Sequence, residues 1–532
     1  MLLYAIIFVS GGAILALELL ASRVMTPYFG VSLYIWTGIL SITLLSLALG
    51  YWIGGRLAAR IDHRARLTQL YALMPAAAAI AIVLACLVYP HTFAALASWS
   101  LVAGAFVASI VLLFVPLVAT SAMNPLLVAL LLRAKQVRGG DAGAGSVFFV
   151  STLGSLAGVI VTAFALIPYV SNFGALLIAG LTLALLSLAA AMLAPSPIAG
   201  RGLVSAAGVL AAVLALALLW NADAYTGRLG PYTYSGTTWR LETAESSLFG
   251  TVKVLKSAPD AESGRFVRMY FQDGLTQNVV DSNNRSASFY TYGLEGLARA
   301  YRPGMRRALM LGLGAGMVPM RLAETGVAVE VVEIDPVSVR IAQKLFGYDA
   351  SKVRTHETDA RTFLHACRSR YDVVVVDLFH GDGTPDYLVT REFFRDLRNC
   401  LAADGVAVFN TFAYLTRPAS YAHLLTTLKS ELPHLALYRP PADGSTLTNS
   451  FIAASAQPLP QPVRVTFDYV PQRHQESLWN MLSAPTPLTP GLFAGGRIVT
   501  DAVNPAAHDH AAVQLAYRRG VVEGMPPAML LN

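Results

Sequence analysis

The sequence is poor in charged residues and in cysteine. Of its 532 residues, 55% are hydrophobic and only 13% are charged, whereas an ordinary soluble domain carries about 25% charged residues. The three cysteines, Cys86, Cys367 and Cys400, lie far apart along the chain. Their number and spacing predict neither a disulfide framework nor a metal site.

The shortage of charge is confined to the first part of the chain. Residues 1–220 contain nine Lys or Arg and three Asp or Glu, which gives a net charge of +6. Residues 221–532 contain 30 Lys or Arg and 29 Asp or Glu, which gives a net charge of +1. The second part therefore lacks the basic surface that nucleic-acid binders need, and we expect no nucleic-acid partner. The contrast predicts one domain in lipid and one in water.

Seven apolar stretches in the first part are long enough to cross a bilayer, which takes about 20 residues. They predict a transmembrane helical domain over residues 1–220, embedded as a multi-pass protein in a cell membrane with the lipid bilayer as its partner. The segments are 2–21, 36–55, 69–89, 100–119, 144–168, 173–193 and 203–220.

Basic residues occupy alternate connections between these segments. The stretch GGRLAARIDHRAR, residues 54–66, carries four arginines, and Arg133, Lys135 and Arg138 follow the fourth segment. The positive-inside rule places these loops and the N-terminus in the cytoplasm. Seven crossings would then leave the second part outside the cell, whereas a cytoplasmic cofactor would require it inside. On cofactor grounds we expect the second part in the cytoplasm, although the count of segments argues otherwise. The sequence also leaves open a homo-oligomer.

The second part changes to short strands and amphipathic helices. Residues 248–256 and 266–272 alternate like half-buried strands around a polar loop, which predicts a small β-hairpin domain over residues 221–284. From residue 285 a helix leads into strand, helix, strand, helix, written RALMLGLGAG, MVPMRLAETG, AVEVVEID and PVSVRIAQKLFG. This alternation predicts a parallel sheet with helices on both faces, and thus an α/β Rossmann-like domain over residues 285–532.

A glycine-rich turn with Gly312, Gly314 and Gly316 connects the first of these strands to its helix. Glycines allow a tight turn and a close approach of backbone to ligand, and a helix N-terminus favours negative charge. Ligands of such sheets bind at the carboxyl ends of the strands. The GxGxG spacing favours S-adenosylmethionine over a dinucleotide, although simple turn chemistry would need the same glycines.

Acidic residues end the next three predicted strands. Glu333 and Asp335 close the second strand, where an acid can accept the hydroxyls of a ribose. Asp359, followed by Ala360, comes after VRTHET and could receive an adenine amino group, and Asp377 ends the run VVVV. Each also has a structural interpretation, such as a solvated strand end for Glu333 or a helix N-cap for Asp359. Together with the glycine turn, they favour a nucleoside cofactor.

The motifs FQDGLTQ, MLGLGAG, VVEID, TDA and VVVVDLF occur in an order that resembles the spermidine synthases, the polyamine aminopropyltransferases. The resemblance covers residues 240–455. The whole chain is similar to the membrane-fused branch of that family through ALELLASRVMTPYFGVSLYIWT, DLFHGDGTPDYLVTREFF and RIVTDAVNP. The resemblance implies a transferase that moves an aminopropyl group from decarboxylated S-adenosylmethionine to an amine such as putrescine, with no tightly bound cofactor.

The resemblance also implies roles for single residues. Glu333 would hold the ribose, Asp359 would read the adenine, and Gln277 would line the active site. Asp377 would take a proton from the attacking amine, a task that suits a carboxylate held beside the nucleophile. Asp273 shares a predicted turn with Gln277 and is expected on the substrate side.

Several positions depart from the family pattern. Ala315 stands where these synthases carry an acid on the glycine turn, His380 replaces a second acid that helps bind the amine, and Gly250 replaces a glutamine. Asp382, on the same loop as His380, could supply a substitute charge. The departures keep two alternatives open: methyl transfer from intact S-adenosylmethionine, and a membrane transporter or sensor with a non-catalytic cofactor-binding domain.

Overall fold

The computed structural model describes residues 2–133, 140–193, 198–228, 230–379, 383–414, 419–440, 447–467, 469–470 and 472–531. The chain folds as two compact units. The first comprises Met1–Ser235 with Arg518–Asn532, and the second comprises Gly236–Tyr517. The last residues belong to the first unit, where Arg518 is fully buried and donates a hydrogen bond to the carbonyl of Pro27. The division at residues 220 and 284 stays a prediction.

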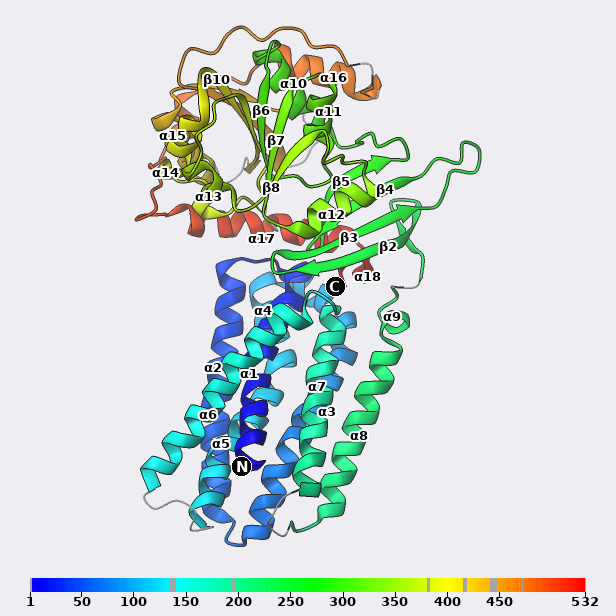
Figure 1. The fold of residues 1–532 in the computed structure, drawn as a ribbon, viewed down its shortest axis with the longest axis vertical. Coiled ribbons are helices and arrows are strands. Elements are labelled where there is room, and N and C mark those ends of the chain that lie inside the picture. Colours follow the sequence, from blue (N-terminus) through cyan, green and yellow to red (C-terminus); the bar gives the residue numbers. More distant parts are fainter. Residues whose placement is uncertain are drawn as a thin grey trace. The chain divides into compact units, whose positions relative to one another are not determined.

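The first unit is built from long apolar helices (Figure 1). Among the described residues, seven helical runs are long and apolar enough to cross a membrane, as predicted. The fourth run joins α4 to α5 through the π-helical segment η1, and the fifth extends α6 by η2. The elements are α1 Leu2–Phe29, α2 Leu33–Arg60, α3 Arg64–Trp99, α4 Leu101–Ser109, η1 Ile110–Phe114, α5 Val115–Arg133, α6 Gly140–Val161, η2 Thr162–Leu166, α7 Asn172–Leu193, α8 Arg201–Trp220 and α9 Ala222–Tyr225.

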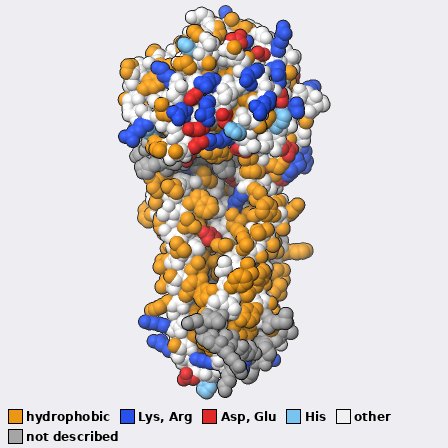
Figure 2. Space-filling model, turned by 60° about the vertical axis from the view of Figure 1, so that its left-hand side comes forward, with side chains coloured by type: hydrophobic (Ala, Val, Ile, Leu, Met, Phe, Trp, Pro, Cys, Tyr) orange, Lys and Arg blue, Asp and Glu red, His pale blue; other side chains and the backbone are white. Residues whose placement is uncertain are grey.

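Small residues let α1 and α6 pack with their backbones in contact. A Cβ atom on Gly158 would lie 2.2 Å from the carbonyl oxygen of Gly12, and one on Gly154 would lie 1.9 Å from that of Phe8. Ser155 donates a hydrogen bond of 2.9 Å to the carbonyl of Gly11. Such contacts are typical of helices that associate in lipid. Large apolar side chains cover the outside of the unit (Figure 2).

The second unit begins with an antiparallel β-meander. Strands β2 to β5 pair in sequence order, and β3 and β4 correspond to the two strands expected around residues 248–272. The tight β4–β5 turn uses Asp273 and Gly274 at positive φ, 47° and 84°. The bounds are β1 Tyr232–Tyr234, β2 Thr237–Ser247, β3 Gly250–Ser257, β4 Val267–Gln272 and β5 Leu275–Asp281.

A seven-stranded sheet forms the rest of the core of this unit, in the order β11-β12-β10-β9-β6-β7-β8. The five strands from β10 to β8 are parallel, and β12 is antiparallel to its neighbours β10 and β11. This is the predicted Rossmann-like α/β architecture, and its strand order reverses between β6 and β9. The bounds are β6 Arg307–Leu311, β7 Ala328–Glu333, β8 Val353–Glu357, β9 Tyr371–Val376, β10 Leu401–Tyr414, β11 His434–Tyr438 and β12 Leu447–Ser455.

Helices cover both faces of this sheet, so its strands are buried on both sides. Val373 and Val375 pack into the cluster formed with α10, α11, α12 and α16. Val374 and Val376 pack into the opposite cluster with α13, α14 and α15. Burial on both faces explains the unbroken valine run. The helices are α10 Phe289–Tyr301, α11 Met317–Glu324, α12 Pro336–Leu345, α13 Ala360–His365, η3 Asp386–Leu388, α14 Arg391–Cys400, α15 Ala419–Glu431, α16 Gln472–Ser483, η4 Pro490–Phe493, α17 Ala506–Gly524 and α18 Pro527–Leu530.

The second unit contains a disulfide that the cysteine spacing did not predict. Cys367 follows α13, Cys400 ends α14, and the two form a disulfide with their Cα atoms 6.0 Å apart. Spacing in the sequence did not indicate this pair, because the two cysteines are 33 residues apart and meet through the side-by-side packing of α13 and α14.

Candidate functional site

A cavity of about 360 Å³ opens at the carboxyl ends of the parallel strands in the second unit. Its volume lies within the range of about 300–1,000 Å³ that is usual for small-molecule sites. It lies at the strand ends of β6, β7 and β9, beside the reversal of strand order where ligands of open α/β sheets bind. Eight residues singled out in the sequence line it: Gln277, Gly312, Gly314, Glu333, Asp335, Asp359, Ala360 and Asp377.

Gly312 allows two strand ends to meet in the floor of this cavity. Its φ is +92°, and a Cβ atom there would lie 2.2 Å from the carbonyl oxygen of Asp377. No other residue type fits both conditions. Gly314, at φ +54°, also lines the cavity. Gly316 does not; it precedes α11 at φ +77° and approaches the ring of Tyr348.

Glu333 ends β7 with both carboxylate oxygens held by backbone. The N–H groups of Leu313 and Asp335 donate to Oε2 and Oε1 at 2.9 and 2.8 Å. Burial raises the pKa of Glu333 to about 7, while these two donors act in the opposite direction. Each carboxylate oxygen can accept a second hydrogen bond, so the group suits a pair of neighbouring hydroxyls.

Asp335 and Asp359 line the cavity and also cap helices. Asp335 Oδ1 accepts from the N–H of Val337 at 2.9 Å at the start of α12. Asp359 Oδ1 accepts from the N–H of Thr362 at 2.8 Å at the start of α13, and Tyr387 donates its hydroxyl proton to Oδ2 at 3.3 Å. The capping interpretation of Asp359 and its place in the cavity are therefore compatible.

Asp377 follows β9 and lies at one end of a chain of hydrogen-bonded polar side chains. Asn410 Nδ2 on β10 donates to Asp377 Oδ1 at 2.9 Å, and Asn449 Nδ2 on β12 donates to Asn410 Oδ1 at 3.0 Å. Burial raises the pKa of Asp377 to about 6, and the bond from Asn410 partly opposes the rise. The carboxyl group is therefore fixed in place and still mostly ionised at pH 7.

Asp273 does not line the cavity, contrary to its predicted place beside the substrate. The residue is buried in the β4–β5 turn, where its Oδ1 accepts from the N–H of Thr251 at 2.9 Å. The φ of 47° turns its side chain toward β3. A Cβ atom on Gly250 would lie 2.3 Å from Asp273 Oδ2, which accounts for the glycine at position 250.

Three positions from the family comparison remain. His380 and Asp382 lie outside the described residues. Ala315 is 2% exposed and packs in an apolar cluster that includes Val252 and Val337, and it does not line the cavity. Within the described residues, no group of three or more His, Cys, Asp or Glu side chains is placed to hold a metal ion.

The lining residues that were not singled out in the sequence include Phe249, Gln272, Tyr290 and Tyr387. Gln272 is part of the motif FQDGLTQ and could have been found there. Tyr290 lies in the first turn of α10, where burial and then the nearby charge of Asp377 raise the pKa of its hydroxyl. No motif marks Tyr290 or Tyr387, because both reach the cavity through the packing of distant elements.

Strand order and cavity together define the second unit as a Rossmann-like α/β domain with a site at the reversal of its sheet. Residues 288–439 match the family described as the spermine/spermidine synthase domain. The second unit therefore contains a region that is similar to the spermine/spermidine synthase domain.

Proteins with similar sequences support this assignment. The chain is 38% identical over 119 residues to a polyamine aminopropyltransferase of Vibrio vulnificus, which is 21% of this chain and 40% of that protein. It is 26% identical over 326 residues to a polyamine aminopropyltransferase of Mycobacterium tuberculosis, 58% of this chain and 59% of that protein.

A third relative carries a different name. It is the N-terminal histidine N-methyltransferase of Emericella nidulans, 35% identical over 153 residues and matched over 27% of each chain. The chain thus spans less than two thirds of each of these relatives. The solved spermidine synthase of Thermotoga maritima aligns at 17% identity over 47% of this chain and 89% of that chain, with a TM-score of 0.36.

Proposed function

We propose that the second unit transfers an aminopropyl group from decarboxylated S-adenosylmethionine to an amine such as putrescine. The proposal rests on the position of Asp377. Its carboxyl group lines the cavity, is fixed by a hydrogen bond from Asn410, and lies within the residues that match the spermine/spermidine synthase domain. With a pKa of about 6, this group is an anion at neutral pH and can still accept a proton.

The proposed reaction needs a base and an oriented nucleophile. An acceptor amine is protonated at pH 7 and cannot attack carbon until it loses a proton. Asp377 would bind the ammonium group, orient it and take the proton as the C–N bond forms. The C–S bond of the sulfonium breaks with its electron pair moving to sulfur, so that methylthioadenosine leaves as a neutral thioether.

The remaining lining residues would hold the nucleoside. Glu333 would accept hydrogen bonds from the ribose hydroxyls, and Asp359 would accept one from the adenine amino group. The glycine turn would bring backbone against the ligand at Gly312 and Gly314. Gln277 would face the acceptor. The nucleoside would enter and leave as a co-substrate in each turnover.

Methyl transfer from intact S-adenosylmethionine is the second candidate. One relative, matched over 27% of this chain, carries the name N-terminal histidine N-methyltransferase. Ala315 keeps this alternative open, because position 315 packs against apolar side chains and supplies no acid for the amino group of a decarboxylated propyl arm.

The first unit would anchor the protein in a membrane. Its seven apolar runs and its covering of large apolar side chains fit a lipid environment. Lipid would then be the partner of this unit, and the small-molecule substrates would be partners of the second.

The proposed reaction is tested with purified full-length protein, putrescine and either decarboxylated or intact S-adenosylmethionine, followed by mass analysis. Aminopropyl transfer predicts methylthioadenosine and an amine heavier by one aminopropyl group, from the decarboxylated cofactor only. S-adenosylhomocysteine from the intact cofactor would instead favour methyl transfer. Lack of either product, despite nucleoside binding, would contradict both.

A further inference from the structure

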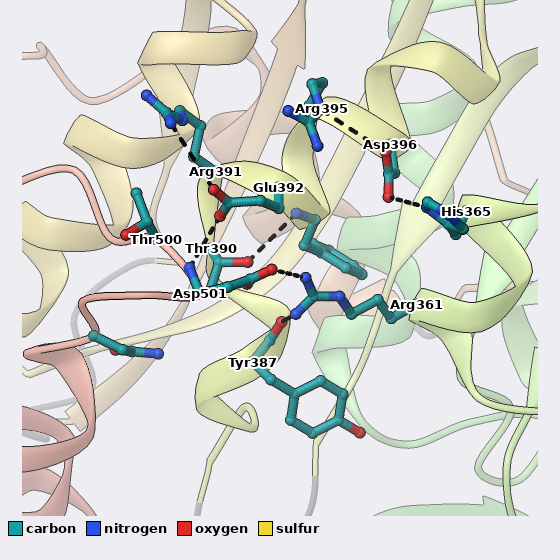
Figure 3. A network of polar contacts seen from close by, with 12 residues as sticks. Arg361, His365, Tyr387, Thr390, Arg391, Glu392, Arg395, Asp396, Thr500 and Asp501 are labelled. Atoms are coloured by element: carbon teal, nitrogen blue, oxygen red, sulfur yellow. Dashed lines mark hydrogen bonds and ion pairs between the residues drawn. The ribbon is translucent and has the colours of Figure 1, made fainter.

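Residues 497–505, RIVTDAVNP, lie beyond the matched family domain and contact the wall of the cavity (Figure 3). Val499 is fully buried, its carbonyl accepts from the N–H of Arg391 at 2.8 Å, and its own N–H donates to Thr427 Oγ1 at 2.9 Å. The segment is therefore tied to α14 and α15 of the sheet domain.

Two side chains extend from this segment to η3, which forms part of the cavity wall. Asp501 forms an ion pair with Arg361 of α13, and Arg361 Nη1 donates to the carbonyl of Tyr387 at 3.1 Å. Asn504 Nδ2 donates to the carbonyl of Asp386 at 3.0 Å. Tyr387 lines the cavity and bonds to Asp359.

We propose that residues 497–505 are a positioning element for the nucleoside end of the cavity. Asp501 acts through Arg361, which fixes η3 and with it the hydroxyl that Tyr387 offers to Asp359. The side chain of Asp501 is 43% exposed, and exposed ion pairs contribute little to overall stability. Its removal should therefore change the site more than the stability of the fold.

Calorimetry with methylthioadenosine as the probe tests this positioning role. Asp501→Asn should weaken binding about fivefold, the value of one net hydrogen bond, while the melting temperature stays the same. Glu324→Gln is the matched control, since it removes an exposed arginine partner on α11, and it should change neither quantity. Unchanged affinity in Asp501→Asn, or a melting temperature that falls in parallel, would overturn the proposal.

Amide hydrogen exchange at residues 386–388 gives a second readout that needs no ligand. Asp501→Asn should speed exchange there, and unchanged exchange would count against the positioning role. The proposed reaction can fail while this result stands, because exchange is measured without substrates.

A separate set of observations concerns the side of the membrane on which the second unit lies. Six of the seven Lys and Arg residues that the structure describes in residues 1–220 lie at one end of the helical unit, near the ends of α2 and α5 or the starts of α3 and α8, and Figure 2 shows blue side chains there. They are Arg56, Arg60, Arg64, Arg66, Arg133 and Arg201. The N-terminus lies at the same end (Figure 1).

The chain leaves the helical unit at the end opposite the basic one. Helix α8 starts at Arg201 on the basic end, and the chain leaves it at the other end, where the Tyr225 hydroxyl donates to the carbonyl of Leu87 at 2.7 Å. On the return, Arg518 Nη1 donates to the carbonyl of Pro27 at 3.0 Å, near the end of α1.

The disulfide is an independent indication of compartment. Cys367 and Cys400 are the two cysteines of the second unit, and they are joined to each other. Disulfides persist in oxidising compartments and are rare in the cytosol. When the disulfide forms, the thiols of Cys367 and Cys400 pass two electrons and two protons to an external disulfide. That external disulfide is thereby reduced to two thiols.

We infer that the second unit lies on the side of the membrane away from the cytoplasm. The inference rests on the proposed membrane anchoring, on the positive-inside rule applied to the basic end and on the disulfide. The sequence left a conflict between seven membrane crossings and the use of a cytoplasmic cofactor. The inference keeps the seven crossings and corrects the expectation that the second unit lies in the cytoplasm. The acceptor is then a molecule of the outer compartment, and a transport step must supply the sulfonium nucleoside there.

Cysteine labelling on the full chain tests this inference in intact cells with a membrane-impermeant maleimide. Ala261→Cys adds an exposed thiol to a loop of the second unit, and His63→Cys adds one to the basic end of the first. The first variant should react in intact cells and the second only after permeabilisation. Any other pattern would overturn the inference. Ala350→Cys and Gly202→Cys repeat the comparison at other exposed positions.

Thiol trapping with acid quenching measures the native cysteines in the same cells. Cys367 and Cys400 should resist alkylation until a reductant is added, and two free thiols would count against the inference. Neither measurement requires turnover, so the compartment and the proposed reaction can fail separately.

Discussion

In both units a glycine lies in close contact with a backbone carbonyl group, but the contact serves a different purpose in each unit. A Cβ atom on Gly158 would lie 2.2 Å from the Gly12 carbonyl, and one on Gly312 would lie 2.2 Å from the Asp377 carbonyl. The first contact packs two apolar helices, and the second brings a glycine turn against the strand end that holds an acid. A glycine at a close contact thus acquires its role from the group that it faces.

The two units also differ in what they bury. The first has few charges and packs through small residues, whereas the second holds Glu333 and Asp377 in its cavity with raised pKa values. Perturbed carboxyl groups collect at functional sites. Changes in the second unit should therefore affect chemistry first, and changes in the first unit should affect stability first.

The largest expected effect comes from removing the charge of Asp377. Asp377→Asn should lower turnover by about 10²–10⁴-fold, the usual contribution of a general base, because the amide cannot accept the proton of the amine. Affinity for methylthioadenosine should change little. Steady-state rates and calorimetry measure the two, and surviving turnover would refute the role of Asp377.

Gly312→Ala should disrupt the site almost as strongly. The added methyl group would clash with the Asp377 carbonyl, and strained backbone at positive φ costs about 1–3 kcal/mol in addition. Gly326→Ala is the matched control, because Gly326 has a φ of +84° and no heavy atom within 4 Å of its Cβ position. Only the first variant should lose nucleoside binding and activity; equal losses would show that backbone strain alone matters.

The packing of the first unit can be broken without a change in the site. Gly158→Val should destabilise the helices, since overpacking of a tight contact costs about 1–3 kcal/mol. Gly145→Val, on the same helix with nothing within 4 Å, should leave stability unchanged. Thermal unfolding in detergent measures both variants. Loss of methylthioadenosine binding in Gly158→Val would show that the two units do not respond separately.

The smallest expected effect is a shift of a pH profile. The Asp377 carboxylate is the active form, so activity should rise with pH through its pKa of about 6. Asn410→Ala removes the donor that lowers this pKa, and the rising limb should move to higher pH. The pH dependence of kcat/KM measures the shift, and an unmoved limb would mean that Asn410 does not tune Asp377.

Much of the architecture could be predicted because its signals are local. Long apolar runs identify the seven helices by length alone. The valine run and the strand–helix alternation predict a parallel sheet, and the ends of parallel strands meet at one edge. The sequence therefore predicts that Glu333, Asp359 and Asp377 lie close together.

What could not be predicted depends on backbone direction and on distant packing. Asp273 and Gln277 are four residues apart, yet a positive φ turns Asp273 away from the cavity. Tyr290 and Tyr387 reach the site from a helix and a short 3-10 turn that no motif marks. Cys367 and Cys400 meet only because two helices pack side by side.

The most direct measurement is the mass of the products formed from decarboxylated S-adenosylmethionine and putrescine by the wild-type protein and by Asp377→Asn. The proposed function predicts methylthioadenosine and an aminopropylated amine from the wild type and a trace at most from the variant. Formation of S-adenosylhomocysteine from the intact cofactor, with no methylthioadenosine from the decarboxylated one, would contradict it.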